Sequence, residues 1–451
     1  MRIFNNKFKA SLLLGTSALL LAACGNGDSN GAGNETNDTG GELIEVTIPS
    51  FKSGQNVGAR LFLGQVERFN ETYEGQYQLN IEEVPQDAYG ELIQQLAQQN
   101  SLPVIVHAPG SGSIDNQWFE NVVIENNLYH DMSGWLEENP EAEDLILDEF
   151  IDFNTTEEGT LVSVPDYRVR SPFLYYNETM YNPDTNIRDM SMEEFSESLG
   201  ENKIAFMTGE NAWTTGLFWS AIIANEPGGA DMLLGANAGE FTELDDPIIV
   251  ESIDKLKTFM QEHGASNTLG AIFADAANAF MSENAAVIPN GPWMTADFEE
   301  ESSDKWSNDF HGSDVRGDYF PGNIGLQSYE AYGDWVSANS SEEEIELAEA
   351  WFTFLHTSDE IETALLAEGG QAPNFEPSEE YLNQLEEDQI LSDIENATSE
   401  ETVFVPNILD VLPSSIGDSE LSRFLPLLLN EEMTPQEFGE ELANRARQAI
   451  Q

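Results

Sequence analysis

Basic residues and cysteine are scarce in this 451-residue sequence. Lys and Arg number 17 against 83 Asp and Glu, which gives a formal net charge of −66 at pH 7, and there is one cysteine. So acidic a chain repels nucleic acid, and binding through phosphate contacts is excluded. The composition is otherwise that of a folded protein, because 40% of the residues are hydrophobic and 10% are aromatic. We expect a salty or alkaline habitat that screens or requires this acidic surface.

Signatures of catalysis and of metal binding are also missing. The sequence contains no G-x-S-x-G elbow, no H-E-x-x-H, no P-loop and no dinucleotide-binding fingerprint. His107 has no second His or Cys at chelating spacing, so neither a metal site nor a cofactor is predicted. A glycoside hydrolase or lyase needs two carboxylates that converge on one bond, and among 83 acids such pairs arise by chance. We therefore expect a binding protein, with a surface hydrolase or lyase as the less favoured alternative.

The single cysteine lies at the end of an N-terminal targeting segment. A basic start precedes a mostly apolar run over residues 10–21, which has the length of a secretory signal and is too short to span a bilayer. The stretch L-A-A-C that ends at Cys24 resembles a bacterial lipobox, in which the thiol is acylated. We predict a signal peptide over residues 1–23 and a lipid on Cys24 that anchors the protein to the extracellular face of the cell membrane. Residues 24–41, rich in Gly, Asn, Ser and Thr, are predicted to form a flexible linker.

Hydrophobic periodicity after the linker predicts an α/β fold. Residues 42–51, 77–84 and 103–106 are typical of strands, and residues 56–73 and 87–100 place apolar residues near helical spacing. Right-handed crossovers would make the three strands of this β-α-β-α-β unit parallel. Open α/β sheets bind ligands at the carboxyl ends of their strands, so the loops after the first and third strands are candidate binding loops.

Glycine and serine are frequent in both of these loops. They let backbone amides and hydroxyls approach a small polar ligand closely, although either loop could be a simple turn. Both loops lie on the same edge of the predicted sheet, which favours a shared site. The binding candidates in them are Ser50, Phe51, Lys52, Asn56, His107 and Ser111.

A second group of candidates lies between two strand-like runs at residues 161–164 and 173–176. The connecting segment carries Asp166, Arg168 and Arg170, and two arginines within three positions stand out in a chain with so few basic residues. They are either ion-pair partners for acidic residues or forked hydrogen-bond donors for sugar hydroxyls or a carboxylate.

Three stretches of the sequence resemble one known family. Residues 164–182, V-P-D-Y-R-V-R-S-P-F-L-Y-Y-N-E-T-M-Y-N, look like the crossover between the lobes of bacterial extracellular solute-binding proteins of the carbohydrate-binding group. Residues 273–298, in which Gly291-Pro292-Trp293 follows a predicted helix and strand, are similar to a second block of that family. Residues 332–360 are similar to the strand and helix that return to the first lobe, and a helical tail follows at residues 434–450.

The resemblance implies a two-lobed clamp of the type II periplasmic-binding-protein class, with a hinge between the lobes. Residues 42–165 would form the first part of lobe 1, residues 166–330 most of lobe 2, and residues 331–451 the return to lobe 1 and the C-terminal helices. It also implies a monomeric substrate-binding lipoprotein of an ABC importer, which binds a sugar or oligosaccharide in the cleft and delivers it to the permease subunits. A receptor for a polyamine, peptide or osmolyte remains an alternative, and Arg168 and Arg170 disfavour a cationic ligand if they face the cleft.

Aromatic residues complete the predicted site, because sugar rings have CH-rich faces that pack on flat side chains. The resemblance places Trp293 in the cleft, and Trp293 is our first candidate. Trp213 and Trp219 lie six residues apart, and we assign Trp213 to the cleft and Trp219 to the core. The weaker candidates are Trp118, Tyr175, Asp334 and Trp335.

Overall fold

The computed structural model describes residues 43–54, 58–110, 114–298, 310–328 and 330–450. The predicted signal peptide, the lipidation site at Cys24 and the linker lie outside these residues, as do Asn56 and Ser111. Within the described ranges, no helix is long and apolar enough to cross a membrane.

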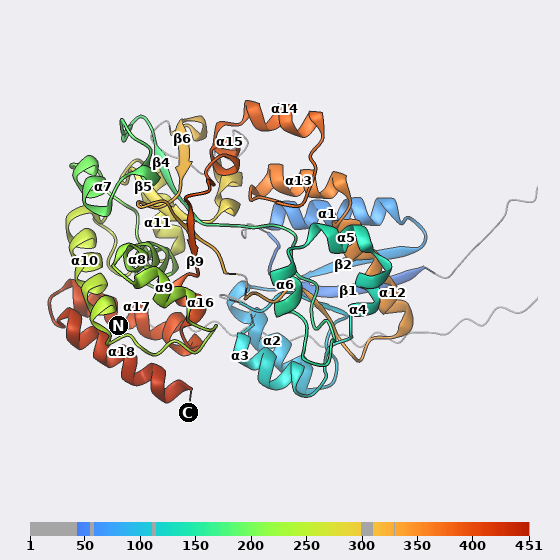
Figure 1. Ribbon diagram of the computed structural model, residues 1–451. Coiled ribbons are helices and arrows are strands. Elements are labelled where there is room, and N and C mark those ends of the chain that lie inside the picture. Colours follow the sequence, from blue (N-terminus) through green and yellow to red (C-terminus); the bar gives the residue numbers. More distant parts are fainter. Residues whose placement is uncertain (1–42, 55–57, 111–113, 299–309, 329, 451) are drawn as a thin grey trace, which may run out of the picture. The chain divides into compact units, whose positions relative to one another are not determined.

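The first lobe is built around the β-α-β-α unit that the sequence predicts (Figure 1). Strands β1 (Ile44–Ser50) and β2 (Tyr77–Glu83) pair in parallel, in a register that runs from Ile44 opposite Tyr77 to Ser50 opposite Glu83. Helix α1 (Ala59–Thr72) joins them and buries Phe62, Val66 and Phe69, which share one helical face. Helix α2 (Gln86–Gln98) follows.

The third predicted strand pairs differently from our expectation. Strand β3 (Ile105–Val106) forms an antiparallel ladder with β8 (Trp335–Val336) in place of a parallel one with β1. The chain that returns from the second lobe supplies this partner, about 230 residues further along the sequence. The carboxyl ends of β1 and β3 are nevertheless joined, because the Oγ of Ser50 lies 2.8 Å from Nε2 of His107.

Short helices follow β3 and complete this part of the lobe. Residues 161–164, which we expected to form a strand, make only isolated bridges, from Leu161 to Thr155 and from Val164 to Asp334. The helices are α3 (Asn116–Trp118), the π-helix η1 (Phe119–Ile124), α4 (Ser133–Glu138), α5 (Pro140–Leu145) and α6 (Asp148–Phe153).

The second lobe contains a three-stranded antiparallel sheet with β4 (Phe173–Asn177) between β5 (Val287–Asn290) and β6 (Val315–Asp318). Helix α8 (Trp213–Asn225) packs against this sheet and against α10 (Pro247–His263), and residues 214–224 are all buried. The other elements before β8 are η2 (Ile187–Asp189), α7 (Met192–Leu199), α9 (Gly229–Leu234), α11 (Phe273–Met281), η3 (Pro292–Phe298), η5 (Gly312–Asp314) and β7 (Ile324–Leu326).

The C-terminal part of the chain serves both lobes. After β8, helix α12 (Glu342–Leu355) packs on β1 and α1 of the first lobe. The remaining elements are α13 (Ser358–Glu368), α14 (Glu379–Glu387), α15 (Gln389–Glu395), β9 (Val403–Val405), α16 (Ile408–Val411), η6 (Ile416–Glu420), α17 (Leu421–Leu429) and α18 (Pro435–Ala449).

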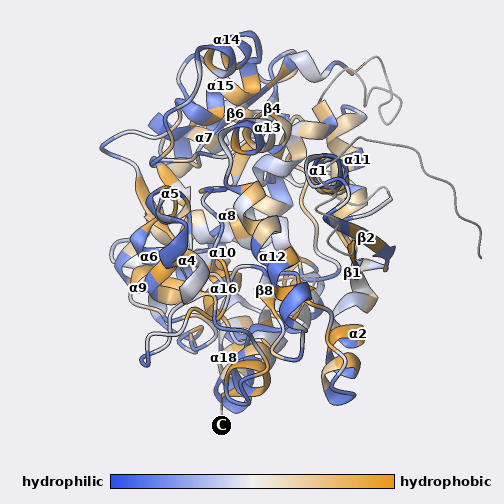
Figure 2. Ribbon diagram, turned by 90° about the vertical axis from the view of Figure 1, so that its right-hand side faces the viewer, coloured by the Kyte–Doolittle hydropathy of each residue, from blue (hydrophilic) through white to orange (hydrophobic). Residues whose placement is uncertain are grey.

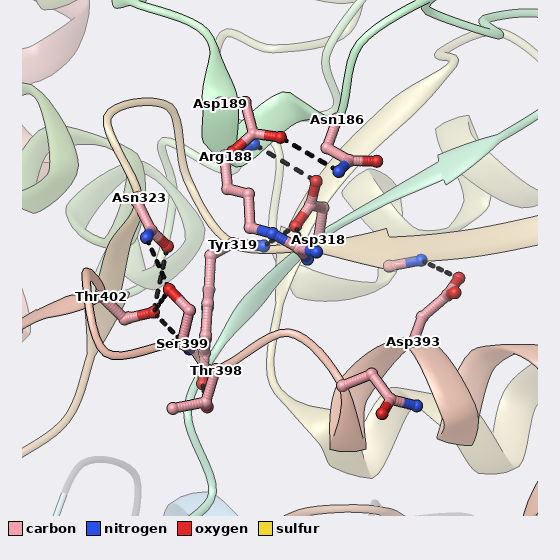
Figure 3. A network of polar contacts seen from close by, with 12 residues as sticks. Asn186, Arg188, Asp189, Asp318, Tyr319, Asn323, Asp393, Thr398, Ser399 and Thr402 are labelled. Atoms are coloured by element: carbon pink, nitrogen blue, oxygen red, sulfur yellow. Dashed lines mark hydrogen bonds and ion pairs between the residues drawn. The ribbon is translucent and has the colours of Figure 1, made fainter.

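Most of these later elements pack on the second lobe. Helix α15 lies against β6, β9 pairs in parallel with β7, and α18 packs on α10. Helix α18 carries hydrophilic and hydrophobic residues along its length, and its apolar face is buried (Figure 2). A polar network also ties the returning chain to this lobe. Asn323 donates to Ser399 over 3.1 Å (Figure 3), and Nε of Arg316 donates to Asp393 over 2.6 Å.

Candidate functional site

A cavity of about 410 Å³ is lined by residues of both lobes and of the segments that join them. The first lobe contributes Lys52, Phe62, Gln65, Ala108, Phe150, Val164, Gly333, Asp334, Trp351, Phe352, Leu355 and His356. The joining segments contribute Pro165, Asp166, Tyr167, Arg168, Arg170, Pro172, Gln327, Ser328, Ala331 and Tyr332. The second lobe contributes Trp213, Leu217, Trp293, Leu326, Asn407 and Asp410.

Two tryptophans form the aromatic part of the cavity wall. Trp213 begins helix α8 and Trp293 lies in the first turn of η3, and their ring centroids are 5.3 Å apart at an interplanar angle of 39°. Both side chains are half-buried. Trp219 lies on the opposite side of α8, fully buried, where its Nε1 donates to Ser252 over 2.9 Å. The assignment of Trp213 to the cavity and Trp219 to the core agrees with this placement.

The indole of Trp293 lies directly over the Cα of Gly291. A Cβ added at Gly291 would meet ring atoms of Trp293 at 2.3 Å, so only glycine leaves room for this ring position. Pro292 starts the 3₁₀-helix, where its fixed φ suits the first position. The hydroxyl of Tyr175 donates to the carbonyl of Gly291 over 3.2 Å, and this hydrogen bond fixes the backbone just before Trp293.

The arginines between the lobes are ion-paired. Asp166 lies 3.2 Å from Arg168 and 3.2 Å from Arg170, and Arg168 lies 3.5 Å from Glu368 at the end of α13. Burial alone would raise the pKa of Asp166, but the two guanidinium groups outweigh it and hold that pKa well below its usual range. The ion-pair interpretation of these arginines therefore describes the structure, and Arg170, the more exposed of the two, retains a solvent-facing guanidinium.

A chain of hydrogen bonds connects the strand ends of the first lobe to the cavity. Ser50 contacts Nε2 of His107, and Nδ1 of His107 lies 3.4 Å from Asp334. Burial lowers the pKa of His107, so the ring is neutral at pH 7. The carboxylate of Asp334 can only accept, so Nδ1 carries the proton and the hydroxyl of Ser50 donates to Nε2.

The contacts among Ser50, His107 and Asp334 are connected as in the catalytic triad of a hydrolase, but a substrate has no access to the serine. Ser50 is fully buried, and its Oγ accepts a hydrogen bond from the backbone amide of Lys52 over 3.0 Å. No substrate carbonyl can reach a hydroxyl so enclosed. The chain instead holds Asp334 in the cavity wall, together with the amide of Ala108, which donates to Asp334 over 2.7 Å.

Burial alone would also raise the pKa of Asp334. The charge of Lys52, the contact with His107 and the hydrogen bond from Ala108 oppose this effect and hold that pKa well below its usual range. Asp334 is therefore an ionised acceptor in the cavity at neutral pH.

Several predicted residues do not reach the cavity. Tyr175 is fully buried on β4 against Phe298, and Trp335 is fully buried on β8 against Phe119, so neither has a face for a ligand. Phe51 packs on Tyr89 and His107. The described residues among our candidates that lie outside the cavity lining are Ser50, Phe51, His107, Trp118, Tyr175 and Trp335.

The cavity also contains residues that sequence reasoning missed. Tyr332 packs between Phe119 and Phe153, with ring centroids 4.7 Å from each, and its hydroxyl donates to Glu120 over 3.1 Å. Its position two residues before the candidate Asp334 could have identified Tyr332 as a cavity residue from the sequence. The others are Phe62 and Gln65 on α1, Asn407 at the start of α16 and Asp410 within α16, and no local pattern marks them as cavity residues. In the described part of the chain, no three metal-ligating side chains cluster.

The chain belongs to the family described as bacterial extracellular solute-binding protein, whose sequence model matches residues 64–390. No curated protein matches the chain. Solved structures do match, and they define the class of fold as the two-lobed clamp of solute-binding proteins.

Three of these structures show how closely the fold is shared. A chitin oligosaccharide binding protein is 16% identical, with a TM-score of 0.68 over 91% of this chain and 99% of its own. A Streptococcus pneumoniae solute-binding protein in complex with the blood group A-trisaccharide is 14% identical, with a TM-score of 0.66 over 90% of this chain and all of its own. A Thermus thermophilus maltotriose binding protein bound with maltotriose is 15% identical, with a TM-score of 0.60 over 90% of this chain and all of its own.

Proposed function

We propose that this protein is the substrate-binding lipoprotein of an ABC importer. It binds a sugar or oligosaccharide in the cavity between its lobes and delivers it unaltered to a membrane permease. The observation that carries the proposal is the Trp213–Trp293 pair in a wall that also holds Asp166, Arg170 and Asp334. Flat aromatic faces beside fixed charged acceptors and donors suit a ligand with CH-rich faces and hydroxyl-rich edges.

The proposed mechanism is closure of the two lobes about the segments that join them. Each lobe contributes part of the cavity wall, so a ligand makes its full set of contacts only when both parts surround it. Two positive-φ glycines, Gly369 and Gly370, precede Gln371, which pairs with Val169 in one joining segment. Such residues absorb a change in backbone angle at little cost.

The membrane anchor belongs to the same proposal. Cleavage before Cys24 and acylation of its sulfur would hold a monomeric receptor at the extracellular face of the membrane, close to its permease. Radiolabelled palmitate should be incorporated into the wild-type protein in a bacterial host, and the Cys24→Ala variant should incorporate none. Equal labelling of the two would remove the anchor from the proposal.

A thermal-shift screen of mono-, di- and oligosaccharides tests the binding function. A ligand present at 100 times its Kd should stabilise the fold by about 2.7 kcal/mol. Mass spectrometry of the recovered ligand separates a receptor from a glycoside hydrolase or lyase, because a receptor returns the sugar intact. Cleavage products that form with the wild-type protein would contradict the proposal.

A further inference from the structure

Each acid that lines the cavity has a positively charged neighbour, with one exception. Asp166 is paired with Arg168 and Arg170, and the acid Glu368 approaches Arg168 from behind the wall. Asp334 is held by the His107 ring and by the positive charge of Lys52.

Asp410 has no such counterpart. Its backbone amide and carbonyl bond to Asn407 and Gly239, but within the described ranges its carboxyl group has no hydrogen bond and no ion pair. It is therefore the one acid in the described cavity wall without a compensating group.

The segments around Asp410 contain no free cation that could serve as its partner. Helix α8, on which α16 packs, has no titratable side chain along its whole length. The acids on the adjoining segments have other partners: Glu240 accepts from the side chain of Asn237, Glu330 accepts from the amide of Ala238, and Glu420 binds Arg445. The remaining charges on the opposite wall are those of Lys52, Asp166, Arg168, Arg170 and Asp334, and these three cations and two acids are balanced only when Glu368, the second partner of Arg168, is included.

Because the carboxyl group of Asp410 is buried without a partner, desolvation raises its pKa to about 7. An ionised carboxylate enclosed in a cavity is stabilised chiefly by a cation. The Trp213–Trp293 pair in the same wall is suited to such a ligand, because tryptophan faces attract a positive charge as well as the CH face of a sugar. The net charge of −66 also draws cations toward the protein.

We propose that the ligand is an amine-bearing sugar and that Asp410 is the specificity-determining residue that pairs with its ammonium group. This inference rests on the proposed sugar-binding function and names the class of sugar. The pairing of Arg168 and Arg170 with acids removes the repulsion that those arginines would otherwise exert on a cationic ligand.

The test uses matched sugars that differ only at carbon 2. Calorimetric titrations would compare glucosamine with glucose, galactosamine with galactose, and β-1,4-linked glucosamine oligomers with the corresponding N-acetylglucosamine and glucose oligomers. In at least one series the amine member should bind about tenfold or more tightly than its neutral counterparts. The Asp410→Asn variant should reduce that preference to within about threefold. Glu240→Gln removes an equal charge from an exposed position outside the cavity wall and should keep the preference.

The pH dependence supplies a second readout. Below the pKa of Asp410, a proton must leave before an ammonium group can pair with the carboxylate, so affinity for the amine member should rise between pH 5 and pH 7, by up to about tenfold per unit. The Asp410→Asn variant should show no such rise.

Neutral sugars that bind as tightly as their amine counterparts in every series would overturn the inference and leave the sugar-binding function intact. An amine preference that survives in Asp410→Asn would also overturn the assigned role of Asp410. If no sugar of either kind binds, the proposed function fails together with the inference.

Discussion

Replacing Gly291 with alanine should weaken sugar binding although Gly291 itself does not line the cavity. The new Cβ would lie 2.3 Å from the indole of Trp293, and ordinary contact begins near 3.4 Å, so the ring must move by about 1.1 Å. Gly291 has no positive φ, and the backbone itself therefore accepts alanine. The strain falls on the orientation of Trp293, which is a feature of the cavity wall.

The expected loss can be bounded from both sides. A gap of about 1 Å forfeits a quarter to a half of the dispersion contact across it, and an anchoring aromatic side chain contributes about 2 kcal/mol or more to binding. Gly291→Ala should therefore raise Kd by about threefold if the ring only shifts. The upper bound is about 30-fold, the level we expect for Trp293→Ala, in which the ring is gone.

Titration calorimetry with the best sugar from the thermal screen is the assay, with circular dichroism to show that both variants fold. Gly134→Ala is the matched control, because a Cβ at Gly134 meets nothing within 4 Å and the residue lies in helix α4. An unchanged Kd in Gly291→Ala, alongside a large loss in Trp293→Ala, would show that Trp293 does not need its present position. An unchanged Kd in Trp293→Ala would remove this residue from the site.

Three further predictions concern charge and burial. Because the pKa of Asp410 is raised to about 7, the contribution of this acid to stability is fully present below pH 3.8 and is lost as the pH rises through 7. The unfolding free energy of Asp410→Asn should therefore match that of the wild type at pH 4 and exceed it by up to about 4 kcal/mol at pH 8.5. Equal stability of the two proteins at both pH values would refute this. Arg168→Met leaves the carboxylates of Asp166 and Glu368 without their buried partner and should cost about 3–5 kcal/mol in urea unfolding, whereas a loss below about 1 kcal/mol would contradict the buried ion pair. A fluorophosphonate probe should not label the native protein, because Ser50 is fully buried, and labelling that disappears in Ser50→Ala would indicate a reactive serine.

Local patterns were sufficient for the first strands and helices of the first lobe and for their order. The spacing of apolar residues in α1 and the alternation in β2 predicted both elements close to their observed ends, because each has one buried face. Ser341 and Glu344 form a capping box at the start of α12, which is likewise a local sequence pattern. Long-range pairing was not predictable in this way: β3 is two residues long, and its partner β8 comes from the returning chain.

The site was only partly predictable for a related reason. Trp293 and Arg170 came from the family resemblance and from the scarcity of basic residues, and both line the cavity. Tyr175 and Trp335 do not line it, because β4 and β8 bury side chains on both faces, so alternation along the strand no longer distinguishes the cavity from the core. Asp410 carries no local signal at all, since its importance depends on which charges the fold gathers around it.

The most direct test of the account is calorimetric titration of the wild-type protein with the sugar panel, followed by mass analysis of the recovered ligand. We predict one binding site per chain for at least one sugar, an affinity that falls at least tenfold in Trp293→Ala, and a ligand recovered intact. Absence of binding by every sugar, or binding that is insensitive to both Trp213→Ala and Trp293→Ala, would contradict a sugar site in this cavity.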